Sequence, residues 1–487
     1  MIPVLFPQPV AIGSGEGGQC RFAGYDPALP RAGAVDATRV YLLQEELAQS
    51  IAKECRRHGL GEPVALAAGI IENFSSLPAT LPQLLAEAHR FADQAEIRIC
   101  LINGGGGGFG DGILFAPALA VLRGRISELL HANQRIDIFS MMPERTAPVV
   151  AHLPGVRVLP MELSLAQLGA YHAFHDFSGM LRDKRFAAMH MTDFYLDCMG
   201  INPDTVPAGD KQPFLPFPGR AAAGIDPACD QLRTLHEGRP LLAFIFTSAY
   251  TRNMPPALAA QVINALWEAG WLPVVLMADA GAAARFVDEY GLADRSADLS
   301  ALSTDFSRYV ELLSRMDAIV SVDTSAVHVG AALGKPTVGL FNSIDMATRI
   351  AYSPTVEGVQ VRYQGKSCVA PCGLSKARAY ISGTLYDGLP VAFERGYACD
   401  EAVDREAILG RATARLKALA DALHPDQELA AIWREATEAL HGALSPCWHN
   451  LQPAEVVAAL GRVRQRTPHQ QGMAAPRTGP SPRNRGE

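Results

Sequence analysis

The stretch that decides the fold is "MDAIVSVDTSAVHVGAALGKPTVGLFNS", residues 316–343. An apolar run that ends at Val322 predicts a short buried strand. The helix that follows is predicted to end at Gly334, because Lys335-Pro336 beyond it stops a helix, and "PTVGLF" then predicts a second strand. Strand, helix and strand in this order predict a parallel βαβ unit of an α/β fold.

The turn between that first strand and the helix predicts an anion-binding site. Asp323, Thr324 and Ser325 favour a helix N-cap, and their turn lies at the carboxyl end of a parallel strand, where α/β folds bind ligands. The N–H groups of residues 324–327 are predicted to face that ligand. His328 shares a helix face with Thr324 and suits hydrogen bonding to a phosphate oxygen. The alternative interpretation is a capped core helix with a packed histidine.

The same alternation of apolar strands and helical segments extends in both directions from this unit. It predicts two Rossmann-like domains with a ligand cleft between them, joined by a Pro/Gly-rich linker at 213–228. Upstream, helices are predicted over 37–59, capped by Asp36, and over 81–94. The expected parts are an accessory N-terminal region (1–95), an acceptor-side Rossmann-like domain (96–220), a donor-side Rossmann-like domain (229–400), C-terminal helices (401–465) and a disordered tail (466–487).

Composition excludes several classes of protein. The chain has 487 residues, of which 48% are hydrophobic and 19% charged, as in an ordinary soluble globular protein. A net charge of −7 gives no general attraction to nucleic acid. The N-terminus lacks a positive segment and is broken by prolines, so it does not resemble a signal peptide, and no apolar run reaches the roughly 20 residues of a membrane helix. We therefore expect a cytoplasmic protein.

A glycine-rich stretch, "GGGGGFGDG" at 104–112, has two interpretations. Its glycines fit the G-x-G-x-x-G pattern of a dinucleotide-binding loop, which would indicate an NAD(P)-dependent oxidoreductase. That pattern needs an acidic residue at the end of the next strand, about 20 residues further on. Asp137 is predicted at the start of that strand and Glu144 beyond its tip, so neither is well placed. The other interpretation is a flexible loop that serves Asp111.

The motifs together resemble a known family. Asp323-Thr324, His328 and "AALGKPTVGLF" resemble the signature of glycosyltransferase family 9, the ADP-heptose:lipopolysaccharide heptosyltransferases, over residues 96–405. The resemblance implies a GT-B fold and an inverting transfer of a sugar, with heptose from ADP-heptose as the expected case. It also implies a glycan or lipid-linked acceptor, a role in lipopolysaccharide biosynthesis and peripheral contact with the inner face of the membrane.

The resemblance also assigns residues to the reaction. Gly110-Asp111, followed by "GILFAPAL", matches the family segment that carries the catalytic base, so Asp111 is the expected base. The alternative role for Asp111 is a helix cap. The residues expected to bind the nucleotide-sugar donor are Arg252, Asp279, Asp323, Thr324, Ser325 and His328, with Asp279 on the ribose and the others at the diphosphate.

Two departures from the family pattern support a different hypothesis. Ser325 and Asn342 stand where the family usually has glycine, and glycine permits close backbone approach to a ligand. A catalytically inactive GT-B-like protein that serves in binding or assembly is therefore the alternative to an enzyme.

No cofactor and no metal are expected. The chain contains no D-x-D triplet, the motif with which metal-dependent glycosyltransferases hold a cation on the diphosphate. Cys368, Cys372 and Cys399, with Cys447 further on, lack the spacing of common zinc sites, so we expect free thiols in a structural loop rather than a zinc site.

Overall fold

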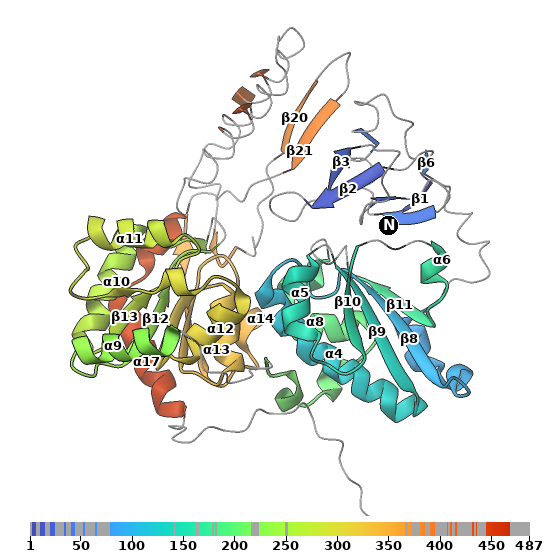
Figure 1. Cartoon of the computed structure of the whole chain (residues 1–487), viewed down its shortest axis with the longest axis horizontal. Helices are drawn as coiled ribbons and strands as arrows, with labels where there is room; N and C mark the ends of the chain where they lie inside the picture. The colour runs from blue at the N-terminus through green and yellow to red at the C-terminus, as the bar shows by residue number, and fades with distance from the viewer. Residues whose placement is uncertain are drawn as a thin grey trace, which may run out of the picture. The chain divides into compact units, whose positions relative to one another are not determined.

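Two parallel sheets, one in each half of the chain, carry the predicted functional residues (Figure 1). The computed structural model describes residues 78–140, 142–161, 163, 165–177, 180, 183–215, 224–248, 252–365, 369–372 and 445–467, with short strand or helix segments elsewhere. Residues 1–216 belong to one compact unit, called unit 1 here, and residues 217–475 form unit 2. The α/β class with two Rossmann-like units, predicted from the sequence, is confirmed.

Unit 2 contains the stretch that decides the fold. Its sheet has the order β14-β13-β12-β15-β16-β17, which is the Rossmann order 3-2-1-4-5-6. The three central strands are buried at every position, as expected for parallel strands covered on both faces. The strands are β12 (Leu241–Ile245), β13 (Leu272–Val275), β14 (Ala297–Asp298), β15 (Ala318–Val322), β16 (Thr337–Phe341) and β17 (Val356–Gln360).

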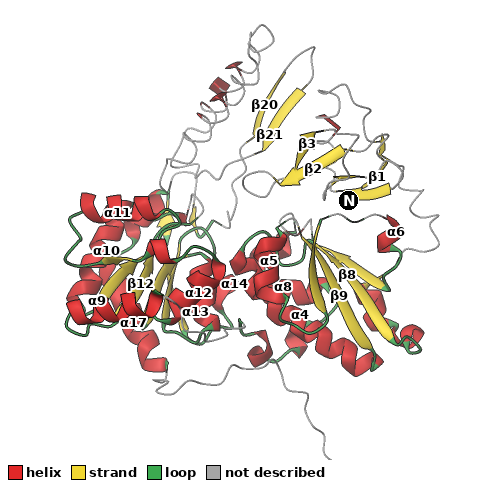
Figure 2. Ribbon diagram, in the orientation of Figure 1, coloured by secondary structure: helices red, strands yellow, loops and turns green. Residues whose placement is uncertain are grey.

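Helices cover both faces of this sheet (Figure 2). On one face α17 (Pro453–Arg466) packs against α10 and places four buried aliphatic side chains in the same core as Trp448. On the other face Val327, Phe341 and Val356 form a smaller cluster. The helices are α9 (Ile225–Leu235), α10 (Pro256–Glu268), α11 (Ala280–Glu289), α12 (Phe306–Ser314), α13 (Ser325–Ala332), α14 (Ala347–Ile350), η8 (Pro446–Asn450) and α17 (Pro453–Arg466).

Unit 1 has a five-stranded parallel sheet of order β10-β9-β8-β11-β7. One face packs against a long helix, α4 (Phe109–Leu130), which contacts α5 and α8. The strands are β7 (Ala79–Thr80), β8 (Glu96–Ile102), β9 (Asn133–Ser140), β10 (Val156–Pro160) and β11 (Ala173–Asp176). The other helices are α3 (Leu81–Ala86), α5 (Pro143–Val150), α6 (Leu165–Leu168), α7 (Lys184–Ala188) and α8 (Met191–Cys198).

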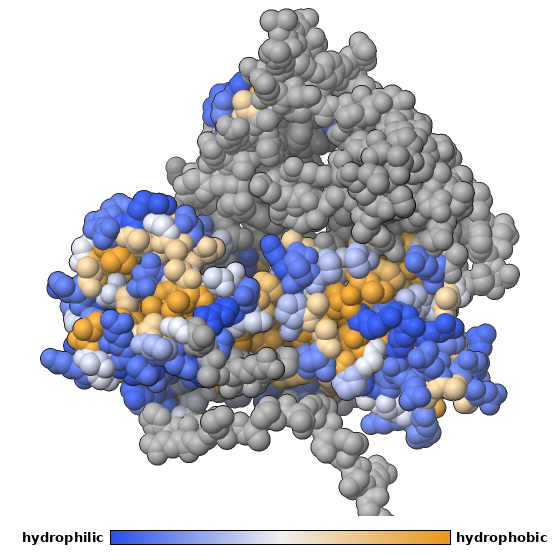
Figure 3. Space-filling view, in the orientation of Figure 1, coloured by the Kyte–Doolittle hydropathy of each residue, from blue (hydrophilic) through white to orange (hydrophobic). Residues whose placement is uncertain are grey.

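The remaining strands belong to small antiparallel sheets. They are β1 (Ile2–Leu5), β2 (Val10–Ser14), β3 (Cys20–Gly24), β4 (Ala34–Val35), β5 (Val40–Leu43), β6 (Val64–Ala65), β18 (Tyr363–Gln364), β19 (Val369–Ala370), β20 (Tyr380–Thr384) and β21 (Pro390–Glu394). On the face in Figure 3, hydrophilic residues lie beside small apolar patches on the described surface of both units. No described helix has the length and apolar character needed to cross a bilayer.

The structure corrects three sequence predictions. The helix predicted over 37–59 is wrong at β5, where β-branched and aromatic residues pair antiparallel with β1 instead. The unit 1 sheet begins at β7, upstream of residue 96, because β7 pairs with β11. The predicted linker at 213–228 contains the start of α9. The second N-terminal helix is confirmed as α3 followed by a 3₁₀ turn, Ala88–Phe91. The tail beyond residue 467 and most of 405–444 lie outside the described residues.

Candidate functional site

The donor-side residues lie at the carboxyl ends of β12 and β15, where the strand order of unit 2 reverses. Arg252 follows β12 and Asp323 follows β15, and the two form an ion pair with Nη1 and Oδ2 3.0 Å apart. Ser248, also after β12, donates a hydrogen bond from its hydroxyl to the carbonyl of Asp323 at 3.0 Å. Ligands of doubly wound folds bind at this kind of switch point. The structure thus brings together Arg252 and Asp323, two of the residues predicted to bind the donor.

Asp323 is a buried carboxylate surrounded by basic side chains. Burial opposes its ionisation, but Arg252, Arg349 and His328 outweigh burial and hold the pKa of this carboxyl below its ordinary value. The Asp323 side chain is only 6% exposed, whereas that of Arg252 is 24% exposed. Asp323 is therefore ionised at neutral pH and anchors Arg252, whose side chain is partly exposed.

The turn at the start of α13 is used in part by its own cap. Thr324, rather than Asp323 or Ser325, is the N-cap, and its hydroxyl accepts a hydrogen bond from the N–H of Ala326 at 3.2 Å. The N–H of Val327 donates to the carbonyl of Thr324 at 3.2 Å. Of the four N–H groups predicted to face a ligand, these two are occupied. The N–H groups of Thr324 and Ser325 make no hydrogen bond to a described residue. Two N–H groups, rather than the predicted four, are therefore left to bind a ligand.

His328 and Arg349 complete the cluster around Asp323. His328 lies one turn into α13 and is 4% exposed. Arg349, on α14, is 8% exposed and donates from Nη1 to the carbonyl and the hydroxyl of Thr348 at 3.0 Å each. Sequence reasoning missed Arg349, which is embedded in "DMATRIAY". The available signal was its place in the segment after β16, the strand beside β15.

Asp279 follows β13, the strand on the other side of β12. It is the N-cap of α11, where it accepts a hydrogen bond from the N–H of Gly281 at 2.8 Å and lies 3.5 Å from Arg285. Its side chain is 68% exposed. Asp279 is thus at the same edge of the sheet as Arg252, but its contacts are within its own helix rather than with the Asp323 cluster.

Asn342, one of the departures from the family pattern, faces the interior. It is 1% exposed, accepts a hydrogen bond from the N–H of Ser343 at 2.7 Å and donates to the sulfur of Cys447 at 3.5 Å. Cys372 lies beside the Asn342–Ser343 segment, with its sulfur 3.9 Å from the carbonyl oxygen of Ser343. The described residues contain no group of three or more potential metal ligands. Cys368 and Cys399 lie outside the described residues, so the prediction for that loop stays a prediction.

In unit 1 the glycine-rich loop wraps around Asp111. The N-cap of α4 is Gly108, so Asp111 is the third helical residue and not the cap. Gly106 has a φ of +65°, and a Cβ there would lie 2.9 Å from both Cβ and Oδ2 of Asp111. A Cβ on Gly104 would meet the Phe115 ring at 3.1 Å. The loop therefore needs glycine where it bends over the carboxylate and where it packs on the α4 core.

The family resemblance assigns Asp111 as the base of a glycosyl transfer, so Gly106→Ala is expected to lower the turnover number of that transfer by roughly ten- to a hundredfold, because the new methyl group displaces the Asp111 side chain by a fraction of an ångström or more. Gly107→Ala is the matched control, since its Cβ would meet only the Met142 sulfur at 3.6 Å. Steady-state kinetics on both variants, with circular dichroism to establish folding, makes the comparison. Equal turnover in the two variants would show that the position of Asp111 is unimportant.

The residue needed for the dinucleotide interpretation is engaged elsewhere. Asp137 lies within β9, rather than at its start as predicted, and is fully buried. Arg157 binds it with two hydrogen bonds, at 2.7 and 2.8 Å, and the Tyr171 hydroxyl donates to it at 2.7 Å. These partners hold the pKa of Asp137 below its ordinary value despite its burial. A ribose cannot reach this carboxylate. The other acidic residue considered, Glu144, lies beyond the end of β9 in the first turn of α5, as predicted, so neither residue is at the end of the strand where the oxidoreductase interpretation needs one.

Comparison with known proteins bears on the same residues. Residues 220–377 match the sequence model of glycosyltransferase family 9 (heptosyltransferase). That segment lies in unit 2 and contains the whole donor-side cluster. A search of curated proteins gave no match.

Several solved structures are similar in fold. ADP-heptose lps heptosyltransferase II of E. coli is 16% identical, with a TM-score of 0.40, over 55% of this chain and 92% of that chain. The glycosyl transferase family 9 protein of Veillonella parvula DSM 2008 is 14% identical, with a TM-score of 0.37, over 55% of this chain and 87% of that chain. The iron-containing dodecameric glycosyltransferase TibC of enterotoxigenic E. coli H10407 is 12% identical, with a TM-score of 0.39, over 89% and 92%.

Proposed function

We propose that this chain, a glycosyltransferase by its family 9 domain at 220–377, transfers a sugar with inversion from a nucleotide-diphosphate donor to an acceptor hydroxyl. The sugar proposed is heptose and the donor ADP-heptose, because the matching family is one of heptosyltransferases. The acceptor is proposed to be a glycan or a lipid-linked glycan, as in lipopolysaccharide biosynthesis. The proposed location is the cytoplasm, with peripheral contact at the inner face of the membrane.

The observation that carries this proposal is the Arg252–Asp323 pair at the switch point of unit 2. A departing diphosphate needs positive charge, and the partly exposed side chain of Arg252 supplies it as a charge-assisted hydrogen-bond donor. Asp323 is itself negative, so we assign it the role of orienting Arg252 and not of contacting the diphosphate. The buried Arg349 adds positive potential behind the same carboxylate.

The other donor contacts follow from the geometry of α13. The free N–H groups of Thr324 and Ser325 and the Ser325 hydroxyl are proposed to bind the diphosphate, with His328 donating from one turn further along. Asp279, exposed after β13, is proposed to accept a hydrogen bond from the ribose. The transfer is proposed to rely on these groups and to need no metal, in keeping with the absence of a D-x-D triplet from the sequence.

Asp111 is proposed as the base that takes the proton of the acceptor hydroxyl as that oxygen attacks the anomeric carbon. It lies at the carboxyl end of β8, which is the switch point of the unit 1 sheet between β8 and β11. The residue is half-buried beneath the glycine-rich loop. The proposal therefore places acceptor activation in unit 1 and donor binding in unit 2.

Donor binding and release test this proposal. ADP-heptose is expected to raise the melting temperature of the protein, and UDP-sugars are not. Arg252→Gln is expected to weaken ADP-heptose binding by at least about tenfold, as for the loss of one charge-assisted contact. Arg252→Lys keeps a positive charge beside Asp323. If Arg252→Gln binds ADP-heptose weakly only because loss of that charge destabilises the fold, Arg252→Lys restores the stability and the binding. Arg295→Gln, an exposed arginine of unit 2, is the control. A specific response to a UDP-sugar would overturn the choice of donor.

The second candidate function is a catalytically inactive binding or assembly protein, which Ser325 and Asn342 suggest. The inward orientation of Asn342 weakens that hypothesis, because its side chain occupies the interior beside Cys447. Nucleotide release from ADP-heptose separates the two candidates. Binding without release, in wild type as in Asp111→Asn, would favour the inactive protein.

A further inference from the structure

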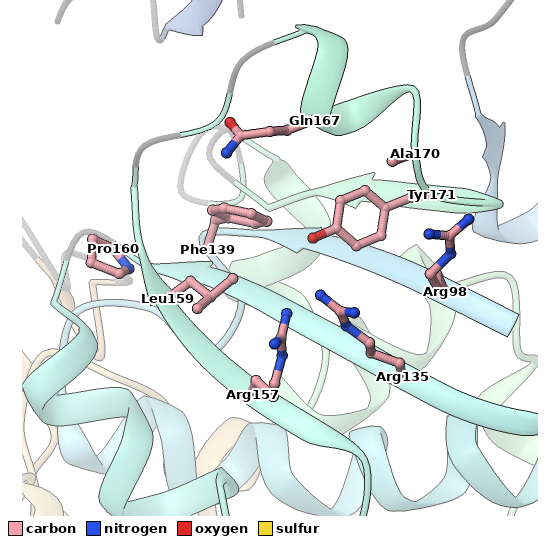
Figure 4. A pocket seen from close by; sticks show the side chains of 9 residues that line it. All are labelled: Arg98, Arg135, Phe139, Arg157, Leu159, Pro160, Gln167, Ala170 and Tyr171. Atoms are coloured by element: carbon pink, nitrogen blue, oxygen red, sulfur yellow. The ribbon is translucent and has the colours of Figure 1, made fainter. Parts of the chain in front are cut away.

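A second polar site lies in unit 1, on the face of the sheet opposite α4. A cavity of about 360 Å³ is lined by Arg98, Arg135, Phe139, Arg157, Leu159, Pro160, Gln167, Ala170 and Tyr171 (Figure 4). The three arginines come from three neighbouring strands, β8, β9 and β10. The apolar side chains lie toward the carboxyl ends of the same strands. The cavity thus has a cationic end and an apolar end.

Two of the arginines are held in place by one buried carboxylate. Asp137 binds Arg157 through Nε and Nη2 and Arg135 through Nε and Nη2, and it is fully buried. A bidentate arginine–carboxylate pair fixes the plane of the guanidinium. The Nη1 groups of both arginines make no hydrogen bond to a described residue. They remain available to a molecule in the cavity.

The third arginine has no counter-ion among the described residues. Arg98 is the register partner of Arg135 on the adjacent parallel strand, so two like charges lie side by side. Like charges at facing positions of a sheet repel each other. Three arginines and Asp137 leave a net charge of +2 at this end of the cavity, and Glu96, exposed at the start of β8, is screened by solvent. A site of this kind is stabilised when an anion enters.

We propose that this cavity binds a phosphate monoester carried on an apolar body. A phosphate monoester has a charge of about −1.5 to −2 at neutral pH, which matches the excess charge better than a carboxylate does. Its oxygens accept hydrogen bonds from Arg98 and from the Nη1 groups of Arg135 and Arg157. Phe139, Leu159 and Pro160 contact the apolar body. No step of the proposed glycosyl transfer requires this site, so the inference goes beyond the proposed function.

Titration calorimetry with phenyl phosphate, inorganic phosphate and phenol tests the site on the full chain. Phenyl phosphate is expected to bind more tightly than either of the other two. Arg98→Gln is expected to weaken the binding of phenyl phosphate by about tenfold or more, which is the effect of losing one charge-assisted contact. The same variant is expected to keep or raise the melting temperature without ligand, because the repulsion with Arg135 is removed. A merely structural role for Arg98 predicts a lower melting temperature.

Two controls make the result decisive. Arg125→Gln alters an exposed arginine of α4, paired with Glu128 at 3.3 Å, and should leave binding unchanged. Excess ADP occupies the proposed donor site, so binding of phenyl phosphate that persists in its presence belongs elsewhere. Equal affinity in Arg98→Gln and Arg125→Gln, no binding at millimolar phenyl phosphate, or loss of binding in ADP would each overturn the proposal. None of these results depends on glycosyl transfer.

Discussion

Asp111→Asn is expected to lower the turnover number for glycosyl transfer by about a hundred- to ten-thousandfold, the usual contribution of a general base. The amide has the same shape as the carboxylate but cannot take the acceptor proton. Donor affinity is expected to stay within about twofold of wild type, because the proposed donor contacts all come from residues of unit 2 and the substitution removes none of them. The measurement is steady-state transfer to acceptor, with donor affinity measured separately by calorimetry.

Asp93→Asn provides the control for this substitution. Asp93 is exposed in the turn before β8, so the same chemical change there should leave turnover unaltered. The pH dependence of kcat gives a second readout, since a base that must be ionised produces an acid limb in the wild-type profile. An Asp111→Asn enzyme that retains wild-type turnover, acid limb included, would remove Asp111 from the mechanism.

Asp323→Ala is expected to lower the free energy of unfolding by about 3–5 kcal/mol, the typical cost of removing one partner of a buried ion pair. Arg252 and the buried Arg349 would then lose the negative charge that both act on. Urea denaturation, followed by circular dichroism, measures the loss. Asp279→Ala is the matched control, because it removes an exposed N-cap carboxylate and should cost only about 1 kcal/mol. Similar losses in the two variants would mean that Asp323 has no special electrostatic role.

The same carboxylate predicts a pH dependence. Because the pKa of Asp323 is lowered in the folded protein, its ionisation stabilises the fold above the unfolded pKa of about 4. That contribution is lost as the pH falls through the lower folded-state pKa. The difference in unfolding free energy between wild type and Asp323→Asn should therefore shrink as the pH drops below about 4. A difference that stays constant over this range would contradict the charge-based explanation.

Much of the fold was predictable because its signals are local. The apolar strand ending at Val322, the capping residues and the stop at Gly334 are contained in one short stretch, and the structure reproduces them as β15 and α13. β5 was not predictable in the same way, because pairing with β1 overrides the helical spacing of its residues. β7 is two residues long, too short for a sequence pattern, and it is a strand because it pairs with β11.

The site was predictable where a residue follows its strand directly. Asp323 follows β15 directly, whereas Arg252 stands seven residues beyond the end of β12, and the strand order brings the two into contact. Arg349 was missed because it belongs to a four-residue helix whose orientation depends on tertiary packing. The glycine run fits a dinucleotide-binding pattern, yet the need for glycine at Gly106 arises from its close approach to the side chain of Asp111. No sequence spacing contains that contact.

The Arg252–Asp323 pair has a consequence for how tightly a ligand can bind. A long arginine side chain loses rotamer freedom when it is fixed in one orientation, and this loss normally weakens binding. Here the buried carboxylate has already fixed the guanidinium in the folded protein. That ordering therefore precedes binding of the proposed donor, and the side chain of Arg252 is preorganised for it.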